Sequence, residues 1–148
     1  QKKKMYIAFA LACNTKILLM DEPTNGLDIL SKSQFRKVIA SAVNEDKCII
    51  ISTHQVKDLE SLIDRITVID EQGILFNENI EEIAKKLSFK ISDDELEIKE
   101  SIYAEKTLRG SAIVVKNTSQ EESKIDFELL YKAIAMNTNT IQSIFNHH

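Results

Sequence analysis

Short, unbroken runs of apolar residues recur along the first half of the chain, and polar residues end each of them. The runs cover residues 17–20, 48–51 and 66–69. Continuous apolar strands that alternate with helices are typical of a parallel sheet covered on both faces. The carboxyl ends of such strands meet at one edge of the sheet, where ligands bind. The pattern therefore predicts an α/β fold with ionisable residues gathered at that edge.

The segments between these runs carry apolar residues at helical spacing. Helices are predicted over residues 2–13, 29–44, 55–62 and 79–87, and a brief strand over residues 74–76. The first helix is expected to bury a stripe of Met5, Ala8, Leu11 and Ala12. The lysines at positions 2–4 are interpreted as a solvated face of that helix. Asp28 is well placed to cap the second helix.

The last third of the chain differs in charge and in pattern. Residues 92–148 hold 6 basic and 10 acidic residues, whereas the part before them is neutral overall. The elements predicted here are strands over residues 98–103 and 112–115 and a helix that begins at Asp126. We therefore expect two parts, an α/β domain over residues 1–88 and a small α+β extension over residues 89–148.

Composition narrows the functional classes. The 148 residues carry a net charge of -4 and no basic stripe, which argues against nucleic acid as the main partner. No apolar run approaches the ~20 residues that span a bilayer.

The glycines stand alone at positions 26, 73 and 110, so no glycine-rich phosphate loop can be written anywhere. Cys13 and Cys48 lack metal-binding spacing and are expected to be small buried apolar residues in a reducing compartment.

Ionisable residues follow two of the predicted strands. Asp21 and Glu22 come after the first strand, and His54 follows the second. An aspartate at a strand end can orient Mg²⁺ through its water shell, and a glutamate beside it can deprotonate a water that attacks phosphorus. A purely structural interpretation also fits: Asp21 and Glu22 would be solvated carboxylates at a strand end, and His54 would cap a strand end. Asp28 would be a plain helix cap. The pattern alone leaves both interpretations open.

The opening stretch QKKKMYIAFALACNTKILLMDEPTNGLD resembles the ATP-binding cassette (ABC) ATPases. Gln1 matches the last residue of the signature motif, residues 17–22 match the Walker B strand with its catalytic glutamate, and residues 25–28 match the D-loop. His54 matches the switch histidine of the H-loop. The order and spacing of four motifs make this resemblance specific, and it covers about residues 1–88.

The resemblance implies a role for each matched residue. Asp21 would hold Mg²⁺, Glu22 would be the general base for the attacking water, and His54 would hydrogen-bond the γ-phosphate of ATP. Asp28 would lie at the interface between two cassettes, and Gln1 would lie near the partner's nucleotide. ATP and Mg²⁺ are therefore the implied cofactors.

Parts of the family pattern are missing from this sequence. It lacks the phosphate loop, the Q-loop and most of the signature motif, and Phe9 and Ile29 stand where arginine and proline are frequent. The resemblance thus implies the C-terminal part of a longer subunit, with a parallel sheet of the P-loop NTPase type that lacks its phosphate-loop strand. Such a fragment is expected to be inactive alone, because nothing in it cradles the β- and γ-phosphates.

The implied function is that of the ATP-hydrolysing subunit of an ABC transporter, in particular an exporter. Residues 89–148 resemble the C-terminal extension of some bacterial ABC-2-type exporters. The implied partners are a transmembrane subunit and a second ATPase subunit, at the cytoplasmic face of the membrane, and no nucleic acid is expected. Two alternatives stay open: a soluble ABC-type ATPase of DNA repair, chromosome organisation or translation, and a non-catalytic binding or dimerisation module.

Overall fold

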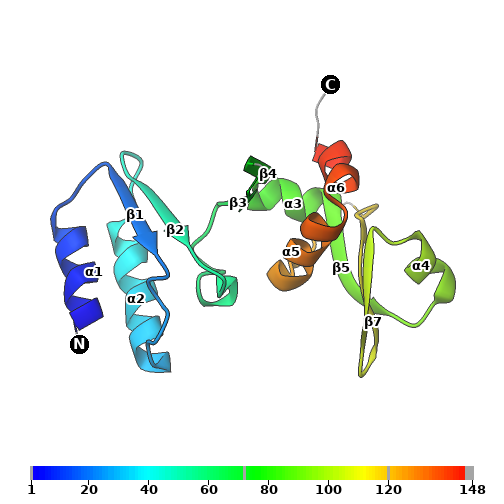
Figure 1. Cartoon of the computed structure of the whole chain (residues 1–148), viewed down its shortest axis with the longest axis horizontal. Helices are drawn as coiled ribbons and strands as arrows, with labels where there is room; N and C mark the ends of the chain where they lie inside the picture. The colour runs from blue at the N-terminus through cyan, green and yellow to red at the C-terminus, as the bar shows by residue number, and fades with distance from the viewer. Residues whose placement is uncertain (1, 72, 120, 146–148) are drawn as a thin grey trace. The chain divides into compact units, whose positions relative to one another are not determined.

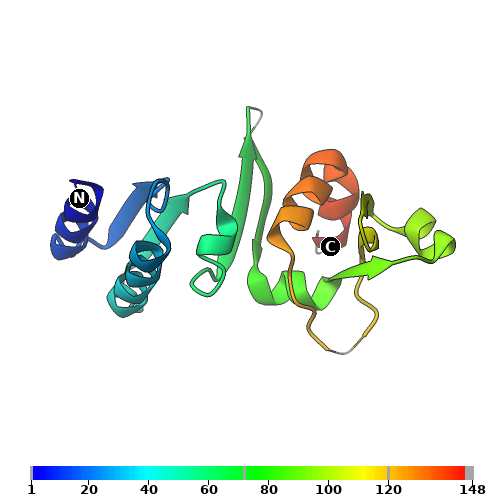
Figure 2. The same ribbon diagram turned by 90° about the horizontal axis from the view of Figure 1, so that it is seen from below.

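The computed structural model describes residues 2–71, 73–119 and 121–145. The chain divides into two compact units, Gln1–Leu62 and Ile63–His148. Figures 1 and 2 show the units from two directions: helices and strands alternate in the first, and helices accompany two small antiparallel sheets in the second. Among the described residues, no helix is both long enough and apolar enough to span a membrane.

The first unit is built on two parallel strands. Its elements are helix α1 (Lys2–Ala12), strand β1 (Ile17–Asp21), helix α2 (Ile29–Ala42), strand β2 (Cys48–Ser52) and the 3-10 turn Val56–Asp58. The register places Asp21 opposite Ser52, so the carboxyl ends of the strands lie side by side. Parallel pairing of the first two apolar runs is confirmed, whereas the helix predicted over residues 55–62 is reduced to a 3-10 turn.

Helix α2 supplies the core of this unit. Asp28 caps it as predicted, because its carboxylate accepts a hydrogen bond from the Ser31 N–H at 2.8 Å. Phe35 and Ile39 lie one turn apart on one face and are buried together with Leu59. Residues of α1, β1 and β2 pack against this cluster, so α2 is the element that connects α1 to the two strands.

Only one face of the β1–β2 pair is covered within this unit. Leu18 is 7% exposed, whereas its neighbours Ile17 and Leu19 are 63% and 70% exposed. Met20, on the same face as Leu18, packs against the α2 cluster. For the described residues of the first unit, the prediction of a sheet covered on both faces is therefore wrong, because both helices of the unit pack on the same side.

Helix α1 turns a different face inward than the sequence predicts. Met5 is 63% exposed, and Ala8 and Ala12 are exposed as well. Ile7 and Leu11 instead pack against the α2 cluster. The predicted stripe is therefore wrong apart from Leu11. Alanine and methionine are tolerated on either face of a helix, so their spacing did not distinguish two adjacent stripes.

The third apolar run forms a separate sheet. Strand β3 (Arg65–Asp70) pairs antiparallel with β4 (Gly73–Asn79) in the second unit and is not hydrogen-bonded to β1 or β2. A tight turn favours this local pairing, because Gly73 has a φ of 128° and its N–H donates to the Asp70 carboxylate at 3.1 Å. The prediction that residues 66–69 extend the parallel sheet is therefore wrong in this structure, and the brief strand at 74–76 is confirmed as part of β4.

The second unit also contains an antiparallel sheet of three strands. Its further elements are α3 (Ile80–Lys86), β5 (Leu87–Ser92), α4 (Glu95–Glu100), β6 (Tyr103–Thr107), β7 (Gly110–Lys116), α5 (Phe127–Met136) and α6 (Thr138–Phe145). The strand order is β5-β7-β6, with β7 in the centre. Helix α5, orange in Figure 1, packs against β6, β7 and α6.

Two elements of this part differ from the prediction. Residues 98–103 are not a strand, because the Asp94 carboxylate caps the short helix α4 and the strand begins only at Tyr103. Strand β5 is not among the predicted elements: it overlaps the helix predicted over residues 79–87 only at Leu87, although apolar and polar residues alternate in its sequence LSFKIS. The strand at 112–115 and the helix start at Asp126 are confirmed.

The two compact units do not divide where the sequence places its domain boundary. The predicted division after residue 88 falls inside β5, which pairs with β7 along its length. The compact units divide between Leu62 and Ile63. Separate domains over residues 1–88 and 89–148 stay a prediction.

Apolar side chains from both sheets and three helices form the core of the second unit. The fully buried side chains include Ile83, Leu87, Ile113, Leu130, Ile134 and Ile141. The rings of Phe76 on β4 and Phe145 on α6 meet edge to face, with their centroids 5.0 Å apart. This contact attaches the β3–β4 hairpin to the last helix.

Replacement of Asp126 by alanine is expected to lower the free energy of unfolding by about 1 kcal/mol, because two helix N–H groups lose their acceptor. The Asp126 carboxylate accepts hydrogen bonds from the N–H groups of Glu128 and Leu129, both at 3.1 Å. Asp126→Asn keeps a side-chain acceptor and is expected to retain most of this stability. Urea unfolding followed by circular dichroism measures both variants, and equal losses in the two would contradict the assigned cap.

Both cysteines are exposed, so the prediction that they are buried is wrong. Cys13 lies just after the end of α1. Cys48 opens β2, which belongs to a sheet of only two strands. A narrow sheet leaves its outer positions without a covering neighbour, so an apolar sequence environment does not ensure burial here.

Candidate functional site

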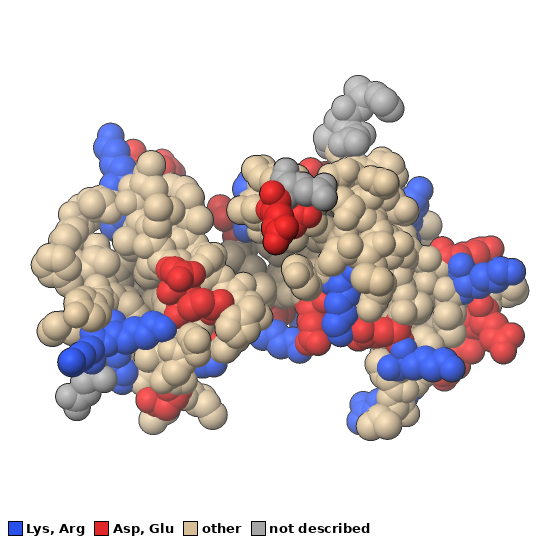
Figure 3. Space-filling model, in the orientation of Figure 1, with Lys and Arg blue, Asp and Glu red and all other residues tan. Residues whose placement is uncertain are grey.

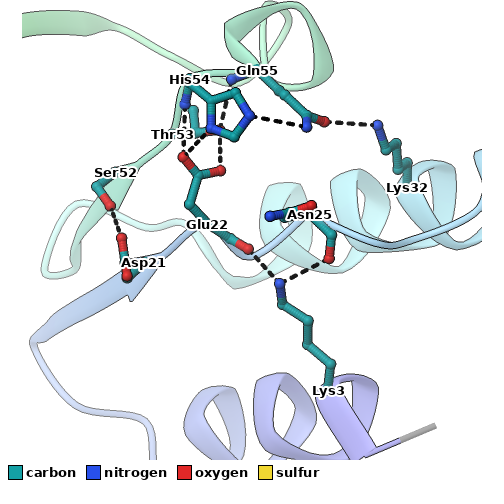
Figure 4. Close-up of polar contacts among 9 residues, drawn as sticks. All are labelled: Lys3, Asp21, Glu22, Asn25, Lys32, Ser52, Thr53, His54 and Gln55. Carbon is teal, nitrogen blue, oxygen red and sulfur yellow. Dashed lines mark hydrogen bonds and ion pairs between the residues drawn. The ribbon is translucent and has the colours of Figure 1, made fainter.

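The carboxyl ends of β1 and β2 bring Asp21, Glu22 and His54 to one edge of the sheet (Figure 4). The Glu22 N–H donates to the Ser52 carbonyl at 2.9 Å, which extends the strand ladder by one residue beyond β1. Glu22 itself has a φ of 43°, a left-handed conformation that is uncommon for a residue with a Cβ atom. The chain therefore leaves the strand in a sharp turn directly at this glutamate.

The Glu22 carboxylate faces His54. His54 Nδ1 lies 2.6 Å from Glu22 Oε1, and the His54 backbone N–H donates to the same oxygen at 2.9 Å. The Thr53 hydroxyl donates to Oε2 at 3.1 Å. The Glu22 side chain is 27% exposed and the His54 side chain 68%. The structure thus brings two of the sequence-predicted site residues into direct contact, in a position that solvent reaches.

Opposing effects set the pKa of Glu22. Partial removal from water raises the pKa, whereas hydrogen bonds from His54 and Thr53 lower it. The lowering effects prevail, so the pKa of Glu22 lies below its ordinary value. The carboxylate is therefore ionised at neutral pH, which is the state in which it can accept a proton. Because its pKa is lowered by folding, the stability that these contacts add is present at neutral pH and is lost only as the pH falls through that lowered pKa.

Asp21 lies at the same edge but does not join the Glu22–His54 contact. Its carboxylate accepts a hydrogen bond from the Ser52 hydroxyl on the neighbouring strand. Figure 4 shows Asp21 and Ser52 set apart from the other pair, as expected for successive residues that point to opposite sides of a strand. Asp21 is exposed, so its second oxygen is accessible to an ion in solvent.

Asp28 has a local role at the start of α2. Both the N–H and the hydroxyl of Ser31 donate to its carboxylate, at 2.8 Å and 2.6 Å. These hydrogen bonds are the main reason that the pKa of Asp28 lies below its ordinary value. Its place at an interface between two cassettes stays a prediction, and Gln1 lies outside the described residues.

Lys3 is a site residue that the sequence interpretation missed. Its Nζ donates to the carbonyl oxygens of Glu22 and Asn25, at 2.5 Å and 2.9 Å. The prediction that the lysines at 2–4 form a solvated face is therefore wrong for Lys3. A signal was present, because Lys3, Ile7 and Leu11 are spaced by four residues and share the inward face of α1.

A second lysine supports His54 from α2. Lys32 donates to Gln55 Oε1 at 3.1 Å and forms an ion pair with Asp58 at 2.6 Å. The Gln55 amide nitrogen in turn lies 3.3 Å from His54 Nε2. The histidine ring is thus held on one nitrogen by Glu22 and approached on the other by a glutamine amide, as Figure 4 shows. No sequence motif pointed to Lys32 or Gln55.

The described residues fit only part of a magnesium–nucleotide site. No group of three or more histidine, cysteine, aspartate or glutamate side chains converges anywhere in the described part of the chain. Asp21 offers one exposed carboxylate, which suits Mg²⁺ held mainly by water and by nucleotide phosphates. A phosphate cradle does not fit, since the sequence has no glycine-rich loop. The described part of the site therefore offers an ionised carboxylate beside a histidine, and no glycine-rich phosphate loop accompanies them in the sequence.

A carboxylate and a histidine are in contact across the ends of two parallel strands, and the sequences that resemble the Walker B, D-loop and H-loop motifs of ABC ATPases follow one another in order around them. No protein-family model matches the chain. An ABC transporter ATP-binding protein of Methanocaldococcus jannaschii is 30% identical over 132 residues, 88% of this chain and 48% of that protein. The chain belongs to the ATP-binding proteins of ABC transporters.

Two further relatives are named for what they transport. The lantibiotic transport ATP-binding protein SrtF of Streptococcus pyogenes is 38% identical over 88 residues, 55% of this chain and 38% of that protein. The bacitracin transport ATP-binding protein BcrA of Bacillus licheniformis is 34% identical over 97 residues, 62% of this chain and 32% of that protein. The chain thus spans less than half the length of these relatives.

Proposed function

We propose that this chain is the C-terminal part of the ATP-hydrolysing subunit of an ABC transporter that exports its substrate. The observation that carries the proposal is the contact of Glu22 with His54 at the carboxyl ends of β1 and β2. An ionised carboxylate in this place is suited to accept the proton of a water that attacks phosphorus. The names of the relatives, which refer to ABC transporters and to lantibiotic and bacitracin transport, support the same class.

The hydrogen bonds of Glu22 indicate which of its oxygens accepts the proton. Each carboxylate oxygen offers two lone pairs. Oε1 already accepts the backbone N–H of His54 and faces its Nδ1, whereas Oε2 accepts only the Thr53 hydroxyl among the contacts of this site. Oε2 thus keeps one lone pair for a water molecule. In this proposal, Oε2 takes the proton while His54 holds the carboxylate in place.

The remaining roles follow from the chemistry of the side chains. Asp21 would supply one oxygen to Mg²⁺, and the bound Mg²⁺ would neutralise charge on the phosphates of ATP. His54 would hydrogen-bond the γ-phosphate through Nε2, the ring nitrogen that does not face Glu22, and Nε2 would then carry a proton and no longer accept the Gln55 amide. Asp28 and Gln1 would lie at the interface with a second ATPase subunit.

The proposed partners are a transmembrane subunit and a second copy of the ATPase, at the cytoplasmic face of the membrane. Nucleic acid is not among them. On the face shown in Figure 3, basic side chains lie among acidic ones over the second unit and form no broad basic patch. A mixed surface of this kind supports a protein partner over a polyanion.

Phosphate release by the full-length protein tests the proposal. We expect Mg²⁺-dependent ATP hydrolysis by that protein, stimulated when it is purified with its transmembrane subunit. The 148-residue chain is the matched control and is expected to show no turnover and no tight binding of a fluorescent ATP analogue, because it has no phosphate loop. Absence of hydrolysis in the full-length protein, or hydrolysis stimulated by DNA and not by the membrane subunit, would contradict the proposal.

A further inference from the structure

The turn that follows β1 is held by a side chain from another element. Lys3, in the first turn of α1, donates from Nζ to the carbonyl oxygens of Glu22 and Asn25, at 2.5 Å and 2.9 Å. In Figure 4 the ammonium group and the Glu22 carboxylate lie on opposite sides of this turn. Lys3 therefore contacts the backbone that carries Glu22, while His54 and Thr53 engage the carboxylate.

The backbone at Glu22 is one that needs support. With a φ of 43°, the Cβ atom of Glu22 crowds its own backbone, and a chain adopts this conformation where its surroundings hold it. On the strand side, the Ser52 carbonyl accepts the Glu22 N–H at 2.9 Å. On the turn side, the Asn25 N–H reaches the Glu22 carbonyl at 3.2 Å, and Lys3 provides a second, shorter contact to the same oxygen.

The position of Lys3 is itself fixed by packing. Ile7 and Leu11, one and two turns further along the same face of α1, pack against the core of the first unit. Lys3 is half-buried on this face, whereas Lys2 and Lys4 on either side of it are exposed. A packed helix thus presents one ammonium group, with its three donors, to the two carbonyls.

We propose that Lys3 is a positioning residue that fixes the direction of the Glu22 carboxylate. The inference rests on the proposed role of Glu22 as the general base. The direction of a side chain follows from the backbone dihedrals at its Cα atom, so the peptide between Glu22 and the next residue must not rotate. Without Lys3, the Glu22 carbonyl oxygen loses its charged hydrogen-bond donor, and the peptide can rotate. The carboxylate oxygen then moves out of the range of about 2.6–3.2 Å from the attacking water, within which a proton can be transferred.

The test compares Lys3→Met with Lys2→Met in the full-length protein. Methionine keeps the length of the side chain and removes its donors. For Lys3→Met we expect kcat of ATP hydrolysis to fall about 10- to 100-fold with KM for ATP unchanged, because a misplaced base slows the chemical step and leaves nucleotide binding intact. Lys2→Met is expected to match the wild type. Lys3→Arg, which keeps charge and donors, is expected to recover most of kcat.

A second arm separates positioning from a general structural effect. In a Glu22→Gln background, Lys3→Met is expected to have no further effect on the residual rate, since there is no base left to position. Thermal unfolding checks that each variant is folded at the assay temperature. Should Lys3→Met not be folded, Lys3→Leu carries the same test, because leucine also keeps an apolar side chain and has no hydrogen-bond donor.

Three results would overturn the role of Lys3. They are a wild-type kcat in Lys3→Met, a rise in KM at constant kcat, and a loss that adds in full to that of Glu22→Gln. A different result bears on the proposed function itself. If Glu22→Gln leaves ATP hydrolysis unchanged, then Glu22 is not the general base, whatever Lys3 does.

Discussion

Replacement of Glu22 by glutamine is expected to lower kcat of ATP hydrolysis by the full-length protein about 10²- to 10⁴-fold, the range that general-base catalysis contributes. The substitution exchanges a proton-accepting oxygen for an amide that cannot take a proton. Binding of ATP is expected to stay intact, because a general base acts in the chemical step and the side-chain contacts of Glu22 in this structure are with His54 and Thr53. Phosphate release and equilibrium binding of a fluorescent ATP analogue measure the two effects separately.

The local structure is expected to survive this substitution. The glutamine carbonyl oxygen can still accept the two contacts of His54, and its amide group can donate to the Thr53 hydroxyl, which is an acceptor as well as a donor. Glu45→Gln is the matched control, because Glu45 is an exposed glutamate at the opposite end of β2. Equal rates for Glu22→Gln and Glu45→Gln would remove Glu22 from the mechanism.

Replacement of Leu130 by alanine is expected to lower the free energy of unfolding by about 2–5 kcal/mol, since it leaves a cavity in a packed core. Leu130 on α5 is 1% exposed, and α5 packs against β7, whose Ile113 and Val114 are 0% exposed. Because the loss falls in the second unit, urea unfolding followed by circular dichroism is expected to show its transition shifted to lower denaturant concentration.

Met136→Ala is the matched control for this prediction. Met136 lies at the end of the same helix and is 74% exposed. Its truncation removes a side chain of comparable size that packs little, so the expected change is less than about 0.5 kcal/mol. Similar losses in both variants would mean that the burial of Leu130 does not stabilise the unit.

The candidate site could be found from the sequence largely because its signals are local. Asp21 and Glu22 directly follow an apolar run, and His54 follows another. The parallel register of β1 and β2 then brings Glu22 and His54 together without any further requirement. Lys3 could not be assigned in the same way, because three consecutive lysines look alike until the inward face of α1 is known.

The fold was harder to predict from the sequence, and two of the errors share one cause. The run at residues 66–69 has the composition of a buried parallel strand, yet β3 pairs with β4 through the tight turn at Gly73. The segment at residues 98–103 looks like a strand, yet the Asp94 cap starts helix α4 before it. In each case a neighbouring turn or cap decided between two states that the apolar pattern favours almost equally.

The sequence by itself determined where β1, β2, α2 and α5 lie, which aspartates cap the two helices, and which side chains follow the strands. These features depend on residues within about four positions of each other, so the sequence contains them directly. Only the tertiary structure decided which strand pairs with which, which face of α1 turns inward, and that Lys3 reaches the Glu22 carbonyl. Such choices depend on competition between partners that are distant in the chain, and the energies that separate them arise only when those partners pack together.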